Sequence, residues 1–276
     1  MTDALAPKMG TNAPAWRQAM YRMFVGRYWP RRMTTADGRF DAYVSASAQL
    51  SVLDPRRVPI DPVHTRFIAH WVQPASVVWD IGGNMGLFAF PAALKASAGM
   101  VYTFEPDVEL ANALLRSMHR PLNRALPVKL MPFALSDVDD ILEFLIADHG
   151  TSMNKLSGEG PWHDNLFVAR EERIVPCFRI DSIAHRLRQP DIIKIDVEGA
   201  ELRVLKGGWS TIASARPVML IEGPKELAPG IDAFLRDLNY VLLDGAVDRP
   251  TELDSIVWDT VAVPREKAPA SLLGRS

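Results

Sequence analysis

Short apolar runs alternate with longer segments along most of the chain, and in the longer segments the apolar residues recur at helical spacing. Short runs bounded by turn residues are typical of buried strands, whereas the longer segments are typical of helices that bury one face. Strands that alternate with helices predict a parallel sheet wrapped by helices. The sequence therefore predicts an α/β fold, a three-layer sandwich around a doubly wound, mostly parallel seven-stranded sheet.

The expected elements follow in a regular order. Strands are expected at 76–81, 100–104 and 127–133, then, after a hairpin-like excursion at 142–145 and a polar loop at 151–164, at 172–178, 191–195, 217–222, 240–243 and 255–263. Helices are expected at 86–97, 107–118, 181–188, 200–206 and 230–238. Because only short loops join the last two strands, we expect that pair to be antiparallel.

The start of the chain differs from the rest in charge. Residues 1–60 hold nine basic and four acidic side chains. Apolar residues recur at helical spacing within 15–29, which predicts an amphipathic helix that packs on the main domain or on a second copy of the chain, or that contacts a membrane surface or polyanion. Asp61 and Pro62 are typical of an N-cap followed by the first helical residue, opening a helix to about Trp71. We expect residues 1–60 to form a tail and a helical appendage, 61–264 the main domain, and 265–276 a C-terminal tail.

The overall composition limits the kinds of binding partner and the cellular compartment that we expect. A net charge of −2 gives no general attraction to nucleic acid, so no such partner is expected. A single cysteine, Cys177, excludes an internal disulfide and is expected to be a buried small side chain in a reducing cytoplasm. Neither a signal peptide nor a transmembrane segment is expected, because the longest charge-free apolar stretch, 81–94, has 14 residues and a span needs roughly 18 or more.

The most informative segment is a buried strand that runs into a glycine-rich turn, from Val77 to Phe88. Glycine permits positive φ and lets a ligand approach the backbone closely. A second apolar strand ends in Glu105, whose carboxylate is placed to accept hydrogen bonds from two ribose hydroxyls. A dinucleotide fingerprint requires a second glycine where this chain has Asn84, and Asp80 would oppose a pyrophosphate. The spacing of Asp80, Gly82, Asn84 and Gly86 instead resembles the first motif of class I S-adenosylmethionine-dependent methyltransferases.

Further matches extend the resemblance over about half of the chain. They are Asp80–Gly86, Phe104–Pro106, Phe133–Asp137, Ile192–Glu201 and Val204–Gly208. In order and spacing these segments resemble the FkbM-type methyltransferase family. The resemblance implies a Rossmann-like class I methyltransferase fold, S-adenosylmethionine as methyl donor with S-adenosylhomocysteine as product, and O-methylation of a hydroxyl on a small-molecule or glycan acceptor such as a sugar, glycolipid or natural product.

The same resemblance assigns the cofactor site residue by residue. It implies that Asp80, Gly82, Asn84 and Gly86 line the methionine end and that Glu105 holds the ribose. The adenine is expected near backbone groups at Ala134, together with Ser136 or Asp137.

The catalytic residues are expected at the ends of two neighbouring strands. A base near the methyl acceptor must take the hydroxyl proton as the new bond forms. Asp196 is the first candidate and Glu198 the second, although either residue could orient the substrate or cap the following helix. Glu222 ends the next strand and is expected in the same cleft. A divalent metal between Asp196 and Glu222 is an alternative, but two acids do not make a site, and no metal is assigned.

Several other side chains remain open on sequence alone. His149 and His163 lie in or beside the polar loop as candidate bases or sugar contacts, and Trp162 is a candidate for stacking on a sugar ring. Lys194 is expected in a structural ion pair. Two rival functions are an NAD(P)-dependent oxidoreductase and a non-catalytic cofactor-binding assembly subunit.

Overall fold

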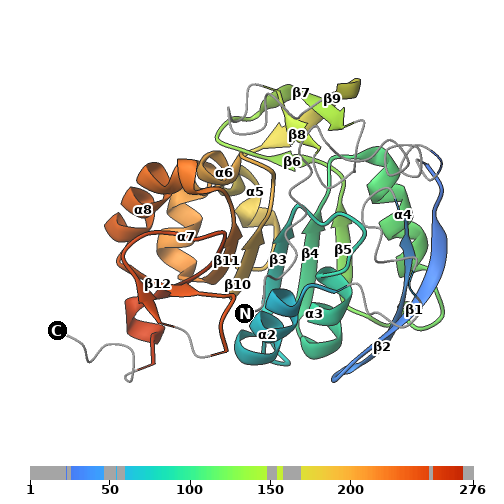
Figure 1. Cartoon of the computed structure of the whole chain (residues 1–276), viewed down its shortest axis with the longest axis horizontal. Helices are drawn as coiled ribbons and strands as arrows, with labels where there is room; N and C mark the ends of the chain where they lie inside the picture. Colours follow the sequence, from blue (N-terminus) through green and yellow to red (C-terminus); the bar gives the residue numbers. More distant parts are fainter. Residues whose placement is uncertain are drawn as a thin grey trace.

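The main sheet of the computed structural model runs in the order β13-β12-β14-β11-β10-β3-β4-β5 (Figure 1). The structure describes residues 23, 26–46, 54, 60–147, 154–157, 169–248 and 251–269. The strands of this sheet are β3 (Val77–Ile81), β4 (Met100–Phe104), β5 (Val128–Met131), β10 (Ile192–Ile195), β11 (Val218–Glu222), β12 (Tyr240–Asp244), β13 (Glu252–Leu253) and β14 (Asp259–Pro264).

The direction of the strands confirms the predicted topology. Strands β5, β4, β3, β10 and β11 are parallel to one another, and β14 is antiparallel to both β11 and β12. The predicted seven-stranded sheet is therefore present, and the two-residue β13 adds a short strand at its edge.

Helices cover both faces of the sheet because its strands are apolar on both sides. The described helices are α2 (Pro62–Trp71), α3 (Ala89–Lys95), α4 (Val108–Met118), α5 (Ile180–Ile183), α6 (Glu201–Gly207), α7 (Trp209–Ala215) and α8 (Ala228–Asp237), with 3-10 turns η4 (Ala184–Arg186), η5 (Lys225–Leu227) and η6 (Arg265–Lys267). Alternate residues of the strands pack into two cores, one beneath α2, α3 and α4 and the other beneath α5 to α8. Asp61 caps α2 through Val63 N at 2.7 Å, as predicted.

A second, four-stranded sheet lies beside the carboxyl end of β5 (Figure 1). Its order is β6-β9-β7-β8, from β6 (Ala134–Leu135), β7 (Asp140–Ala147), β8 (Lys155–Leu156) and β9 (Ala169–Phe178). The expected strand 172–178 is therefore real but belongs to this sheet, where β9 pairs antiparallel with the excursion strand β7.

A β-hairpin formed by β1 (Trp29–Thr35) and β2 (Gly38–Val44) lies along α4 (Figure 1). Phe40 stacks on Phe90 of α3 with ring centroids 5.7 Å apart, and Ala42 and Val44 are fully buried in the first core. These two strands were not predicted from the sequence. The expected helix at 15–29 lies almost entirely outside the described residues. In the described part of the chain, no helix is long and apolar enough to cross a membrane.

Candidate active site

The glycine-rich turn after β3 is held by two neighbouring strands. The N–H groups of Gly82 and Gly83 both donate to the carbonyl oxygen of Phe104, at 3.0 and 2.9 Å. Gly82 has φ of 84°, and a Cβ there would lie 1.9 Å from the carbonyl oxygen of Asp196. A Cβ on Gly83 would lie 2.0 Å from Thr103 Oγ1. The close approach of β4 and β10 therefore requires both glycines, before any ligand is considered.

Asn84 and Gly86 complete the turn, with φ of 47° and 79°. Asn84 lines the cavity described below, and its buried Oδ1 accepts no hydrogen bond from any described residue. A buried polar atom without a partner is costly, so Asn84 is suited to a polar group of a ligand. Gly86 instead packs against Phe90, since a Cβ on Gly86 would lie 2.7 Å from the Phe90 ring.

Asp80 is completely buried at the end of β3. Its Oδ2 accepts a hydrogen bond from Thr103 Oγ1 at 3.0 Å, and its Oδ1 lies 3.6 Å from Lys194 Nζ. Burial raises the pKa of Asp80, and the Lys194 ammonium opposes that rise. Asp80 therefore lies buried beneath the turn, next to Lys194, and is not among the residues that line the cavity.

Glu105 lies directly after β4 and accepts a hydrogen bond from the backbone of the turn. Its Oε2 accepts from the Asn84 N–H at 2.7 Å, and its Oε1 accepts from the Asp107 N–H at 2.8 Å. Burial raises the pKa of Glu105 to about 8, against the effect of these two hydrogen bonds. Each carboxylate oxygen has a second lone pair, so this cavity-lining residue can accept further hydrogen bonds from hydroxyls.

Lys194 and Asp196 bring opposite charges to the end of β10. Lys194 Nζ donates to the carbonyl oxygen of Gly82 at 2.9 Å and to Asp196 Oδ2 at 3.1 Å, which is the ion pair expected for this lysine. About a third of the Asp196 side chain is exposed (34%), and this residue lines the cavity. Burial raises the pKa of Asp196, and Lys194 opposes the rise. A cavity-facing carboxylate with a raised pKa is suited to accept a proton.

The loop after β10 is shaped by Glu201. Its carboxylate accepts from the N–H groups of Gly199 at 3.1 Å and Val197 at 3.2 Å, and burial raises its pKa to about 7. Neither Asp196 nor Glu198 caps α6, whose start has no side-chain cap. Glu198 has φ of 52° and lines the cavity. Burial and the nearby carboxylates raise the pKa of Glu198 well above its usual value.

Glu222 pairs with a histidine that sequence reasoning did not consider. Its Oε1 lies 2.5 Å from His64 Nε2, and His64 packs edge-on against Phe88. Burial lowers the pKa of His64, but the Glu222 charge and hydrogen bond outweigh it and leave the pKa raised. Helix α2 and strand β11 thus bring together two residues 158 positions apart. In the described part of the chain, no group of three or more His, Cys, Asp or Glu residues is arranged to hold a metal ion.

The three residues expected near an adenine separate in the structure. Ala134 lines the cavity. Ser136 is buried and donates from Oγ to Asp137 Oδ1 at 3.2 Å, and Asp137 pairs with Arg203 at 2.7 Å. Ser136 and Asp137 therefore join β6 to α6. His149, Trp162 and His163 lie outside the described residues.

A cavity that is partly open to solvent joins these groups. Its polar lining is Asn84, Glu105, Asn154, Asp196 and Glu198. Its apolar lining includes Phe104, Leu110, Phe133, Phe144 and Leu156. The main sheet supplies one wall, and β7 and β8 supply another. A concave site with a mostly apolar lining and a few converging polar groups is typical of sites for cofactors and small molecules.

The strand order, the antiparallel β14 and a glycine turn at the carboxyl edge of the sheet define a class I methyltransferase fold. Residues 80–242 match the family model of the methyltransferase FkbM domain, and the chain belongs to that family. This finding confirms the resemblance predicted from the sequence and gives the chain a methyltransferase domain.

Individual relatives are more distant. The chain is 27% identical over 170 residues to the hexuronic acid methyltransferase AglP of Haloferax volcanii, with 60% of this chain and 62% of that protein covered. It is 28% identical over 191 residues to the methyltransferase sdnD of Sordaria araneosa, with 58% of this chain and 72% of that protein covered. A crystal structure of methyltransferase FkbM from Methylobacillus flagellatus is 17% identical, with a TM-score of 0.49 over 74% of this chain and 48% of that one.

S-adenosylmethionine is the cofactor that family membership implies, and the cavity fits it. The apolar side chains of Leu110, Phe133 and Leu156 line the cavity and offer a surface suited to an adenine ring. Glu105 offers acceptors for ribose hydroxyls, and the unpartnered Oδ1 of Asn84 offers an acceptor for the ammonium of the methionine end. These assignments rest on the chemistry of the lining.

Proposed function

We propose that this protein is an S-adenosylmethionine-dependent O-methyltransferase that acts on a hydroxyl of a sugar, glycolipid or other natural product. The observation that carries the proposal is the position of Asp196, at the carboxyl end of β10, in the same cavity as Asn84 and Glu105. The bound cofactor supplies an electrophilic methyl group. Every other task falls to side chains of the protein.

Asp196 is the proposed general base. Methyl transfer forms a carbon–oxygen bond while the hydroxyl loses its proton, and the Asp196 carboxylate accepts that proton. Lys194 fixes the orientation of this carboxylate through its contact at 3.1 Å. Glu198, in the left-handed conformation on the same lining, is placed to orient the acceptor.

The charge of the cavity supports a hydroxyl acceptor over a carboxylate. Asp196 and Glu198 both line the cavity, and Glu222 adds to the negative field at each of them. An anionic acceptor group would be repelled there, whereas a neutral hydroxyl would not. The name of the Haloferax relative, a hexuronic acid methyltransferase, is a reason to test hexuronic acids beside neutral sugars, and the proposal expects the methyl group on a hydroxyl and the sugar carboxylate to lie away from Asp196 and Glu198.

The test measures cofactor binding first and transfer second. S-adenosylhomocysteine should bind in calorimetric titration and should raise the thermal midpoint, because it binds only the native state. Transfer is then followed with methyl-labelled S-adenosylmethionine against hexuronic acids, neutral sugars and their glycosides. Binding without transfer to any acceptor would favour the non-catalytic assembly subunit. Binding of NAD and not S-adenosylhomocysteine would favour the oxidoreductase, which the family match does not support.

A further inference from the structure

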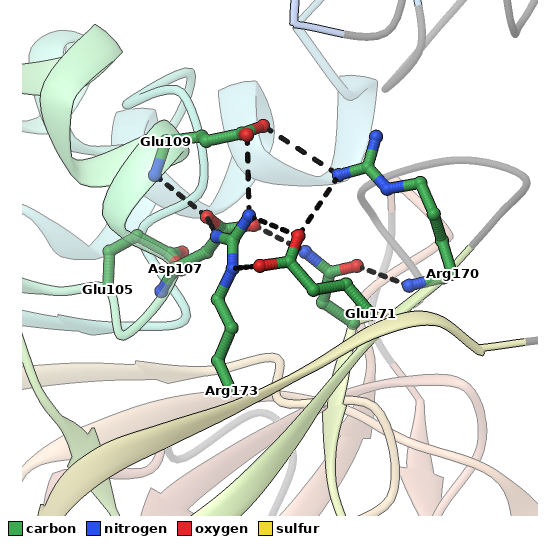
Figure 2. Close-up of polar contacts among 8 residues, drawn as sticks. Glu105, Asp107, Glu109, Arg170, Glu171 and Arg173 are labelled. Atoms are coloured by element: carbon green, nitrogen blue, oxygen red, sulfur yellow. Dashed lines mark hydrogen bonds and ion pairs between the residues drawn. The ribbon is translucent and has the colours of Figure 1, made fainter.

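An ionic cluster joins the four-stranded sheet to the start of α4 (Figure 2). At its centre, Arg173 of β9 lies 2.7 Å from Asp107 Oδ1 and 3.3 Å from Glu109 Oε1. The same guanidinium donates to both oxygens of Glu171, at 2.7 and 2.8 Å. Arg170 faces Glu109 and Glu171 at 3.9 Å. Only 14% of the Arg173 side chain and 1% of the Asp107 side chain are exposed, so this pair is shielded from water and from salt, whereas Glu109 and Glu171 lie at the exposed side of the cluster.

Asp107 connects this cluster to the cofactor carboxylate. Its own N–H donates to Glu105 Oε1 at 2.8 Å, and its side chain is almost fully buried. Besides Arg173, it accepts from the Asn154 side-chain amide at 2.7 Å, through Oδ2. A displacement of the Asp107 carboxylate would therefore move the peptide that holds Glu105.

Asn154 carries the connection into the cavity. It lines the cavity together with Phe144 of β7 and Leu156 of β8. Its Oδ1 also accepts from the N–H of Ala147 at 2.9 Å, which fixes the end of β7. The four-stranded sheet is thus a cavity wall, and its buried polar attachment to the start of α4 runs through Asp107.

We propose that Asp107, Arg173 and Asn154 form a latch that holds the four-stranded sheet against the adenosine half of the cofactor and keeps Glu105 in position. The three are positioning residues, acting through Glu105 and the wall. The inference rests on the cofactor site proposed above. It assigns to the second sheet a role in cofactor affinity, and to these residues a role outside methyl transfer itself.

The test compares two ligands in calorimetric titrations of the full chain. S-adenosylhomocysteine and 5′-methylthioadenosine share the adenosine half, and the second lacks the amino-acid half. Arg173→Gln removes the charge that binds Asp107, and we expect both ligands to lose affinity by a similar factor, about tenfold. The matched control is Arg179→Gln, which breaks the exposed pair with Asp139 at 2.9 Å at the end of β9. We expect the control to bind both ligands like the unaltered protein.

A second measurement separates a latch from general loosening. Amide hydrogen exchange should show that S-adenosylhomocysteine protects both the glycine turn and β9 in the unaltered protein. In Arg173→Gln the protection of the turn should remain and that of β9 should be lost. Unchanged affinity in a folded Arg173→Gln variant, an equal loss in Arg179→Gln, or a loss confined to S-adenosylhomocysteine would overturn the latch.

A third variant tests the same proposal in case the Arg173→Gln protein does not fold. If Arg173→Gln does not fold, Asn154→Ala gives the same comparison, because it removes the wall's contact with Asp107 and leaves the ion pairs in place. If the unaltered protein binds neither ligand, the cofactor assignment fails, and that outcome differs from a latch variant that loses binding.

Discussion

Gly82 and Asp196 are in backbone contact, although 114 positions separate them in the sequence. The place of a Cβ on Gly82 is occupied by the Asp196 carbonyl oxygen, 1.9 Å away. This oxygen belongs to the same residue whose carboxylate faces the cavity. The glycine turn and the proposed base are therefore parts of one rigid unit.

Gly82→Val should consequently disturb both stability and cofactor binding. The new side chain would meet the Asp196 backbone and a φ of 84° that valine rarely adopts. We expect a lower thermal midpoint and at least about tenfold weaker S-adenosylhomocysteine binding, or roughly 1.4 kcal/mol. Gly26→Val is the control, because Gly26 has φ of 69° and no described atom lies within 4 Å of its added Cβ. Native stability and affinity in Gly82→Val would show that β10 does not press on this turn.

Asp196→Asn should keep the fold and the cofactor but lose methyl transfer. The amide has nearly the shape of the carboxylate, and Lys194 retains its bond to the Gly82 carbonyl oxygen. Loss of a general base typically costs about 10²- to 10⁴-fold in rate. The measurement is turnover with a working acceptor beside a titration with S-adenosylhomocysteine. Turnover near that of the unaltered protein would transfer the role to Glu198, Glu222 or a histidine.

Cofactor affinity should rise with pH through the titration of Glu105. Burial raises the pKa of this carboxyl to about 8 in the free protein. The ionised form is the one that accepts two ribose hydroxyls, so binding below that pKa must release a proton. Well below about pH 8, affinity should rise about tenfold per pH unit, and it should level off above. Glu105→Gln should bind weakly with a flat profile, and a flat profile in the unaltered protein would refute the assignment.

His64→Gln should remove a pH-dependent part of the stability. The raised pKa of His64 stabilises the folded state fully below its ordinary value of 6.5, and this contribution is lost as pH rises through the folded pKa. The lowered pKa of Glu222 stabilises above its ordinary value of 4.5, and this is lost as pH falls through its folded pKa. The thermal midpoint of the unaltered protein should therefore fall above neutral pH more steeply than that of the variant. Parallel curves would exclude a charged pair.

Cys177 should resist alkylation in the folded protein. It is fully buried, as predicted, and burial raises the pKa of its thiol to about 11. The thiolate is the reactive form, so both access and ionisation are lacking. Mass spectrometry after iodoacetamide treatment near pH 8 should show an unmodified native chain and a modified denatured one. Rapid labelling of the native chain would reveal an opening of β9.

Local pattern was enough to predict most of the main sheet and the glycine turn. Strands buried on both faces and helices buried on one leave periodicities that need no partner to be recognised. The pattern does not say which strand pairs with which, so the strand at 172–178 was predicted while its separate sheet was not. The hairpin had a local signal, because an Asp–Gly pair is typical of tight turns, and here Asp37 lies in the turn and Gly38 begins β2.

Contacts between distant segments account for the rest of the site. Nothing near His64 in the sequence points to Glu222, and the pair exists only because α2 reaches the end of β11. Glu201 has a clearer origin, since it lies in the same matched segment as Asp196 and Glu198. Its hydrogen bonds with the N–H groups of Val197 and Gly199 could not be predicted, because they depend on the backbone conformation of the loop.

The position of strand β14 limits where the protein can be truncated. The segment recognisable as the family domain ends at residue 242, whereas β14, at Asp259–Pro264, is inserted between β11 and β12. A recombinant fragment cut at the family boundary would lack an interior strand and would present two hydrophobic strand edges to solvent, an arrangement prone to aggregation. The smallest fragment worth expressing therefore extends beyond Pro264, and at the other end it includes the hairpin that begins at Trp29.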